Sequence, residues 1–96
     1  MPKVVLSSDF DNEYQDLQKN YPEIKSVINQ KVIWFKKNPQ DSRLENHPLT
    51  KKMTGKWAFS ITDDIRIVYR WTNKTTARFL EIGPHSKVYK KQSPKR

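Results

Sequence analysis

The stretch that decides the fold spans residues 55–82 and reads GKWAFSITDDIRIVYRWTNKTTARFLEI. Apolar and polar residues alternate along it with a period of two, which is typical of strands that bury one face. Asp63-Asp64 and Asn73-Lys74 are turn sequences that divide the stretch into three strands. Strands joined by such tight turns pair antiparallel, so the stretch predicts an antiparallel meander.

The residues before the meander predict a short strand and two helices. Residues 3–7 have the apolar centre of a strand, and residues 8–11 suit a helix start, with a hydroxyl group at the cap and acidic residues in the first turn. Apolar residues then recur at helical spacing in two segments, which are separated at residues 20–22 and end before Pro39. Pro22 suits the first turn of the second helix, where a missing N–H has no cost.

We therefore predict an α+β fold, in which the N-terminal strand and two helices pack on one face of a twisted antiparallel sheet of about four strands. The aromatic-rich face of the meander is the better surface for the helices. Arg66 and Arg70 alternate with those aromatic residues, so we expect them on the opposite face, open to solvent or substrate. The polar residues 38–55 predict a long loop, and long loops in small domains are more often functional than idle.

The composition indicates one small domain. The 96 residues are too few for two cores, so we assign residues 1–90 to a single domain and residues 91–96 to a basic tail. There is no Cys, and two His residues are too few for a usual structural zinc site. No apolar run approaches the roughly 18 residues that span a bilayer, and the apolar N-terminal stretch is too short for a secretory signal. We expect a cytoplasmic protein that uses no membrane, metal or other cofactor.

The charge distribution favours an anionic partner. Lys and Arg number 19 against 10 Asp and Glu, which gives a net charge of +9. Residues 1–35 carry 4 basic and 5 acidic side chains, residues 36–56 carry 6 and 2, and residues 57–96 carry 9 and 3. A basic region of this kind suits a polyanion, usually a nucleic acid, although lysines scattered over a surface would give the same composition.

The titratable residues after position 40 suit RNA cleavage without a metal. In that reaction a base removes the 2′-OH proton, cations hold the charge on the phosphate, and an acid protonates the leaving 5′-oxygen. Histidine suits both proton transfers, and arginine is a rigid bidentate donor to phosphate. Each residue also has a purely structural interpretation: either His, Arg66 and Arg70 as surface residues, Asp64 as a turn residue and Tyr89 as a core anchor.

Four segments together resemble the RelE/ParE toxin superfamily. They are Asn46-His47-Pro48-Leu49, Gly55-Lys56-Trp57-Ala58-Phe59-Ser60-Ile61, Asp64-Ile65-Arg66-Ile67-Val68-Tyr69 and Leu80-Glu81-Ile82-Gly83-Pro84-His85-Ser86-Lys87-Val88-Tyr89. The similarity is greatest to the YafQ-like mRNA interferases, whose pattern is His-Pro-Leu, a Gly-x-Trp strand, an Arg-hydrophobic-hydrophobic-Tyr strand, and a terminal Gly-x-His with an aromatic residue four positions later. The resemblance covers residues 10–90, and the C-terminal half is its specific part.

This resemblance implies the toxin of a type II toxin–antitoxin pair, an endoribonuclease that cleaves mRNA on the ribosome and is inactivated by a cognate antitoxin. His85 matches the C-terminal catalytic His, Tyr89 the aromatic residue after it, and His47 the His before Pro-Leu. Asp64 matches a catalytic Asp of the YafQ-like branch, and Arg66 matches the phosphate-contacting Arg of RelE-type members. The basic residues expected to bind RNA beside them are Lys51, Lys52, Lys56, Arg70 and Lys87.

Two positions depart from the YafQ-like pattern. Ser60 stands where that branch has another active-site His, and Ile65 stands where it has Trp. RelE-type members use Arg, Lys and Tyr instead. Two other functions stay open, a non-enzymatic ParE-type toxin that acts on DNA gyrase and a basic adaptor that binds RNA without cleaving it. His85 and Tyr89 favour the ribonuclease, because ParE-like members generally lack this terminal set.

Overall fold

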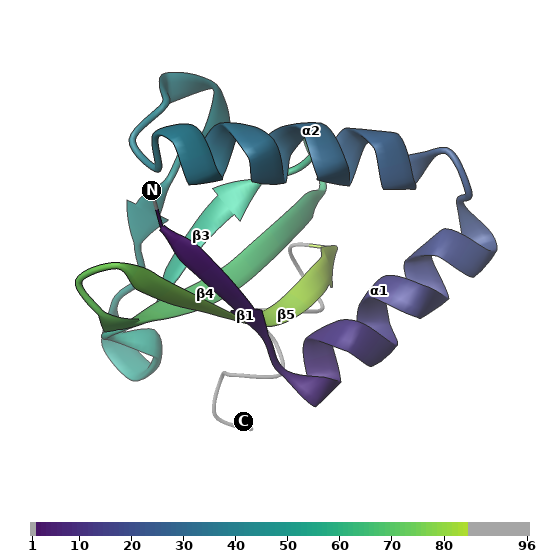
Figure 1. Ribbon diagram of the computed structural model, residues 1–96. Coiled ribbons are helices and arrows are strands. Elements are labelled where there is room, and N and C mark those ends of the chain that lie inside the picture. Colours follow the sequence, from purple (N-terminus) through teal and green to yellow (C-terminus); the bar gives the residue numbers. More distant parts are fainter. Residues whose placement is uncertain (1, 85–96) are drawn as a thin grey trace.

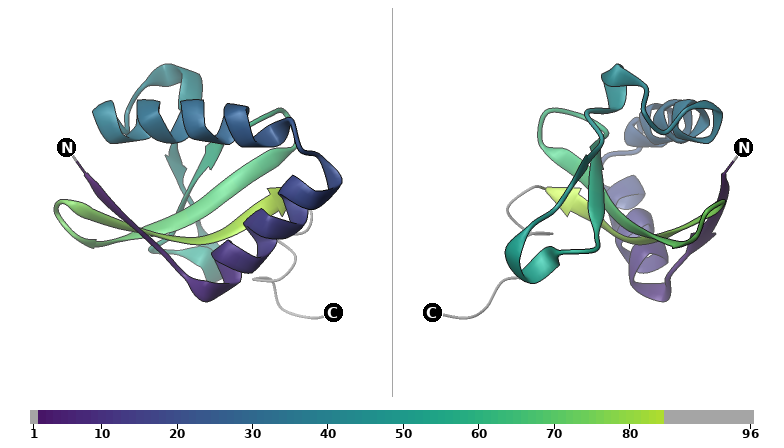
Figure 2. Two further views of the ribbon diagram at one scale, coloured as in Figure 1. Left: turned by 45° about the vertical axis from the view of Figure 1, so that its right-hand side comes forward. Right: turned by 90° about the vertical axis from the view of Figure 1, so that its left-hand side faces the viewer.

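Five strands and two α-helices form two layers in the computed structural model, which describes residues 2–84 (Figure 1). Both helices lie on one side of a single twisted sheet (Figure 2). The predicted α+β architecture is therefore confirmed. The elements in chain order are β1 (Lys3–Leu6), α1 (Ser8–Asn20), α2 (Ile24–Lys37), the 3-10 helix η1 (Ser42–Leu44), β2 (His47–Pro48), the 3-10 helix η2 (Lys51–Met53), β3 (Trp57–Ser60), β4 (Ile65–Asn73) and β5 (Thr76–Pro84).

The sheet has the strand order β1-β5-β4-β3-β2. Strands β3, β4 and β5 are antiparallel neighbours, which confirms the predicted meander. β1 pairs with β5 in parallel, so the sheet is mixed rather than wholly antiparallel. The helical hairpin separates β1 from the meander, and without a tight turn nothing imposes antiparallel pairing on it.

The second edge strand, β2, lies inside the segment that the sequence predicts to be a loop. It pairs with β3 through His47–Ala58 and Pro48–Trp57, which gives five strands where about four were expected. Two residues are too few to show a period of two, and one of them is Pro, which is found mainly at sheet edges. The sequence of the segment therefore gave no indication of a strand.

Local hydrogen bonds fix the helix boundaries. Ser7 caps α1, because its side-chain oxygen accepts a hydrogen bond from the Phe10 backbone N–H. The Ile24 N–H donates to the carbonyl of Tyr21, and α2 begins at Ile24. Pro22 thus lies in the turn between the helices, and the expectation that it occupies the first turn of the second helix is wrong. The hydrogen bond from Ile24 to Tyr21 spans Pro22, which places Pro22 before the first residue of α2.

Aromatic side chains form the core between the helices and the sheet. Phe35 of α2 is fully buried, and its ring centroid lies 4.9 Å from that of Phe59, 5.0 Å from that of Tyr69 and 5.6 Å from that of Phe79. These three rings come from β3, β4 and β5, so one helical residue contacts the whole meander. The prediction that the aromatic face of the meander contacts the helices is confirmed.

The other face of the sheet carries the arginines of the meander. Val68, which alternates with Arg66 and Arg70 along β4, is buried on this side against Met53 of η2. The two arginines therefore lie opposite the helices, as predicted. We call this side of the sheet the cationic face; among residues 2–84, η2 covers it at its β3 end.

Candidate functional site

A β-bulge in β5 shapes the cationic face. Val68 pairs with Glu81, but the next residue of β4, Tyr69, pairs with Phe79, so Leu80 is an extra residue in β5. Directly paired residues share a face, and the bulge therefore turns Glu81 to the side of Val68. Strict alternation would have placed Glu81 on the same side as Phe79, beneath the helices.

The start of α1 satisfies the polar backbone groups of this bulge. The Ser7 N–H donates to Phe79 O at 3.0 Å, and the Ser7 hydroxyl donates to Leu80 O at 2.9 Å. The Ile82 N–H donates to Glu13 Oε1 at 3.0 Å. Because backbone groups that leave the ladder need other partners, these bonds hold the first turns of α1 against the bulge.

A cleft of about 510 Å³ lies between the bulge, β4 and the start of α1. The cationic side chains that line it are Lys56, Arg70 and Arg78, and they are accompanied by the carboxylates of Asp9 and Glu81. Arg70 and Arg78 are direct partners in the β4–β5 ladder, and both are exposed. Two neighbouring guanidinium groups in a cleft suit an anion such as a phosphate.

Arg66 lies on the same face, nearer the turn between β3 and β4, and its guanidinium is already oriented by the protein. Its Nη1 donates to Ser60 Oγ at 3.1 Å, to Thr62 O at 2.8 Å and to Asp63 O at 2.9 Å. The Nη2 and Nε donors are not engaged by residues 2–84. Arg66 can therefore support the turn with one edge and bind an anion with the other.

Asp64 lies apart from the cationic cleft. It is exposed in the β3–β4 turn and lines a separate hollow of about 210 Å³ with Tyr21, Ile65 and Pro84. This hollow lies between the end of the sheet and the turn that joins the helices. The structure does not bring Asp64 together with the basic residues of the cleft.

His47 belongs to the cationic face by register. It pairs with Ala58, which pairs in turn with Val68. The ring is exposed, and its Nδ1 lies 2.9 Å from the carbonyl oxygen of Glu45. A carbonyl oxygen only accepts, so Nδ1 carries the proton in this contact and Nε2 is the acceptor of the neutral ring.

Hydrogen bonds anchor the segment before His47 to the core. The Tyr69 hydroxyl donates to Asn46 Oδ1 at 2.9 Å, and Asn46 Nδ2 donates to Pro39 O at 2.9 Å. Burial raises the pKa of Tyr69 to about 12, because a phenolate would be costly among aromatic rings. Tyr69 therefore stays a hydrogen-bond donor at neutral pH.

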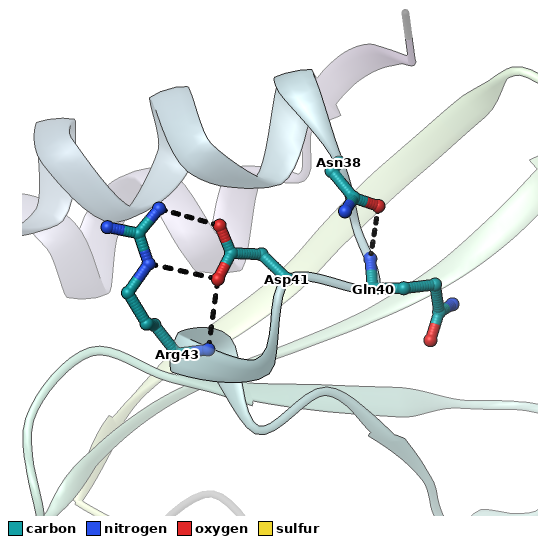
Figure 3. A network of polar contacts seen from close by, with 4 residues as sticks. All are labelled: Asn38, Gln40, Asp41 and Arg43. Atoms are coloured by element: carbon teal, nitrogen blue, oxygen red, sulfur yellow. Dashed lines mark hydrogen bonds and ion pairs between the residues drawn. The ribbon is translucent and has the colours of Figure 1, made fainter.

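A second polar network closes the turn after α2 (Figure 3). Arg43 Nη2 lies 2.7 Å from Asp41 Oδ2, and Arg43 Nε donates to Asp41 Oδ1 at 3.0 Å. Hydrogen bonds from Arg43 lower the pKa of Asp41 to about 2. The same guanidinium lies 3.6 Å from the ring centroid of Trp34, and Asn38 Oδ1 accepts a bond from the Gln40 N–H. These contacts fix the chain between α2 and β2.

Lys51 and Lys52 are exposed residues of η2 and do not line the cleft. Met53 in the same turn is buried against Val68, and this contact holds η2 on the cationic face. The two lysines therefore extend the positive surface toward β3, outside the cleft. Of the other predicted site residues, His85, Lys87 and Tyr89 lie outside the described residues.

Among the cleft residues that the sequence analysis missed are Arg78 and Glu81. The alternation of Arg78 with Ala77 and Phe79 places it on the face opposite those two residues, but it pairs with Arg70 only through a register shift between Trp71 and Asn73. Glu81 had no such signal, because only the bulge brings it to this face. Residues 2–84 contain no group of three His, Asp or Glu side chains that could hold a metal ion.

The chain matches a known protein family along most of its length. A family model described as "Bacterial toxin of type II toxin-antitoxin system, YafQ" matches residues 2–90. The chain belongs to this family. The YafQ-like resemblance is thereby confirmed, while no curated protein matches the sequence significantly. Neither helix of this YafQ-family toxin, in the part that the structure describes, is long and apolar enough to cross a bilayer.

Solved toxin structures share the fold. A copper-bound mutant toxin from Helicobacter pylori is 26% identical with a TM-score of 0.77, and the match covers 92% of this chain and 99% of that chain. The YoeB/ParE toxin from Agrobacterium tumefaciens is 24% identical with a TM-score of 0.74, covering 86% and 98%. A chain of the E. coli DinJ–YafQ complex is 16% identical with a TM-score of 0.70, covering 93% and 99%. These similarities establish the fold of the RelE/ParE superfamily.

Proposed function

We propose that this YafQ-family toxin is an endoribonuclease that cleaves mRNA, in association with the ribosome, by attack of a 2′-OH on the adjacent phosphate. The observation that carries the proposal is the cationic face. There the fold gathers Arg66, Arg70 and Lys56 on one side of a sheet in a chain of the YafQ family. Such a surface supports binding of an extended polyanion rather than of a small neutral substrate.

Arg66 is the proposed phosphate clamp. One edge of its guanidinium is held by the β3–β4 turn, so the group needs little reorganisation to meet a developing charge. His85 and Tyr89 are proposed for proton transfer on the basis of the resemblance, with His47 as a third candidate on the cationic face. Asp64 stays a candidate because its hollow includes Pro84, which immediately precedes His85.

The proposed regulator is a cognate antitoxin with an acidic binding segment. The family is one of toxin–antitoxin systems, and the solved DinJ–YafQ and YoeB–YefM complexes are structures of related pairs. The net charge of +9 supports an acidic partner. Covering the cationic face would neutralise the toxin, because it would remove the surface that binds RNA.

A translation assay with primer extension tests the proposed reaction. Adding the toxin to a cell-free translation system should produce new 5′ ends within the mRNA. The matched variant is His85→Gln, which keeps size and a hydrogen-bond donor but cannot transfer protons. Its single-turnover cleavage rate should fall by roughly 10²–10⁴-fold, with ribosome or RNA affinity little changed.

Two results would overturn the proposal. Arrested translation with intact mRNA would indicate a non-enzymatic toxin. Binding to RNA without new 5′ ends and without arrest would indicate an adaptor. Wild-type cleavage by a folded His85→Gln variant would remove His85 from the mechanism and leave the ribonuclease itself standing.

A further inference from the structure

The fold places two arginines directly opposite each other, with no countercharge bound to them among residues 2–84. Arg70 and Arg78 are ladder partners on β4 and β5, where like charges disfavour pairing. Within residues 2–84 neither Arg70 nor Arg78 makes an ion pair. A surface that keeps such a repulsive pair at the side of a cleft is suited to a ligand that brings the missing negative charge.

We propose that Arg70 and Arg78 bind one phosphodiester group of single-stranded RNA, at a subsite that flanks the phosphate being cleaved. The inference rests on the proposed ribonuclease function and adds a binding site to it. The two guanidinium groups approach the phosphate from adjacent strands. Lys56, at the same cleft, adds positive charge to the site.

The spacing along β4 separates this subsite from the proposed reaction centre. Arg66 and Arg70 are four positions apart in one strand, and strands rise about 3.3 Å per residue, so their Cα atoms lie roughly 13 Å apart. That distance exceeds one nucleotide step of a single strand. If Arg66 holds the phosphate that is cleaved, the Arg70–Arg78 pair holds another one further along the RNA.

The remaining groups of the cleft favour RNA over an acidic peptide as the occupant. The carboxylates of Asp9 and Glu81 line the same cleft and would repel a peptide that carries several carboxylates there, so an acidic antitoxin segment would cover the cationic face outside the cleft. Carboxylates accept hydrogen bonds, and each ribonucleotide offers a 2′-OH donor next to its phosphate. The hydroxyls of Ser8 and Thr72 can donate to phosphate oxygens.

Salt-dependent binding of RNA tests the subsite without requiring cleavage. The probe is a short fluorescein-labelled 2′-O-methyl RNA, which cannot undergo 2′-OH attack. Its anisotropy, followed at several salt concentrations, reports the phosphate contacts and not the 2′-OH contacts. The variant Arg70→Gln/Arg78→Gln should weaken binding about tenfold at low salt. It should also reduce the slope of log K against log salt by about 0.7, the value for one phosphate on a single strand.

The matched control is Lys19→Gln/Lys25→Gln, which removes the same charge from exposed positions in the helical layer. It should leave the slope unchanged, and circular dichroism should show that both variants are folded. An equal slope for wild type and Arg70→Gln/Arg78→Gln, or no binding of the probe by the wild type, overturns the inference. If the slope changes but no mRNA is cleaved in the translation assay, the subsite stands and the proposed ribonuclease function falls. If mRNA is cleaved but wild type and Arg70→Gln/Arg78→Gln have equal slopes, the ribonuclease function stands and the subsite falls.

Discussion

The two faces of the sheet are built from the same strands but follow different physical rules. On β4, Ile67 and Tyr69 are fully buried against the helical layer, whereas Arg70 on the other face is exposed. The helix-covered face has aromatic rings in contact, whereas on the cationic face Arg70 and Arg78 make no ion pair among residues 2–84. Because side chains alternate along a strand, one segment provides both the stability of the fold and a surface for a ligand.

This difference predicts that substitutions on one face should affect stability, whereas substitutions on the other should affect ligand binding. Burial of apolar area is the main source of stability, so changes on the helix-covered face should lower stability and reduce function only through the loss of folded protein. Exposed charges contribute little to stability. Changes on the cationic face should therefore alter RNA binding in a protein that stays folded.

The largest expected effect is the loss of Phe35. The substitution Phe35→Ala removes a fully buried ring that contacts aromatic residues of three strands, and such changes cost about 3–5 kcal/mol of unfolding free energy. Urea denaturation followed by circular dichroism would measure it. The control is Ile33→Ala on the same helix, where the side chain is 49% exposed and the loss should be well below that of Phe35. Similar losses for the two variants would contradict the assignment of the core.

Much of the helix-covered face was predictable because its signals are local. The period of two in residues 57–71 fixes which side chains share a face, and the turn at Asn73-Lys74 fixes which strands are neighbours. Helical spacing likewise located α1 and α2. The one error was to place Pro22 in the first turn of α2, which begins two residues later at Ile24. These patterns are properties of a few consecutive residues, so a sequence displays them directly.

The cationic cleft was only partly predictable because it depends on non-local geometry. Lys56 and Arg70 were expected there, but Glu81 reaches the cleft only through the bulge at Leu80. That bulge in turn depends on a hydrogen bond donated by the Ser7 hydroxyl and one accepted by Glu13 Oε1, and both residues lie about seventy positions away in the sequence. The spacing of apolar residues along the sequence does not indicate contacts between residues so far apart. The parallel pairing of β1 escaped prediction for the same reason.

A smaller effect is expected where the core meets the segment that carries His47. The substitution Tyr69→Phe removes the hydrogen bond to Asn46 Oδ1 and should cost about 1 kcal/mol at pH 7. The wild type should also lose stability as the pH rises from about 10 to about 12. In that window the unfolded chain releases the Tyr69 proton while the folded protein retains it. Denaturation of both proteins at pH 7 and at pH 11 would show the stability gap narrowing.

The matched control for this pH effect is Tyr21→Phe, since Tyr21 is 56% exposed in the turn between the helices. It should show the same pH dependence as the wild type, because it leaves Tyr69 and its buried surroundings unchanged. A gap between wild type and Tyr69→Phe that stays constant up to pH 11 would contradict a retained proton on Tyr69.

The smallest expected effect has the opposite sign and belongs to the cationic face. The substitution Arg78→Gln relieves the repulsion from Arg70 across the ladder, so it should raise the unfolding free energy by a few tenths of a kcal/mol. The gain should shrink as salt is added, because exposed charges are screened. Urea denaturation at low and high salt would measure it, with Lys25→Gln as the control for general charge reduction. A gain in stability together with weaker RNA binding would mean that the fold retains this repulsive pair for its ligand. A loss of stability at low salt would instead make Arg78 a structural residue. Both faces of the sheet would then contribute to the stability of the fold.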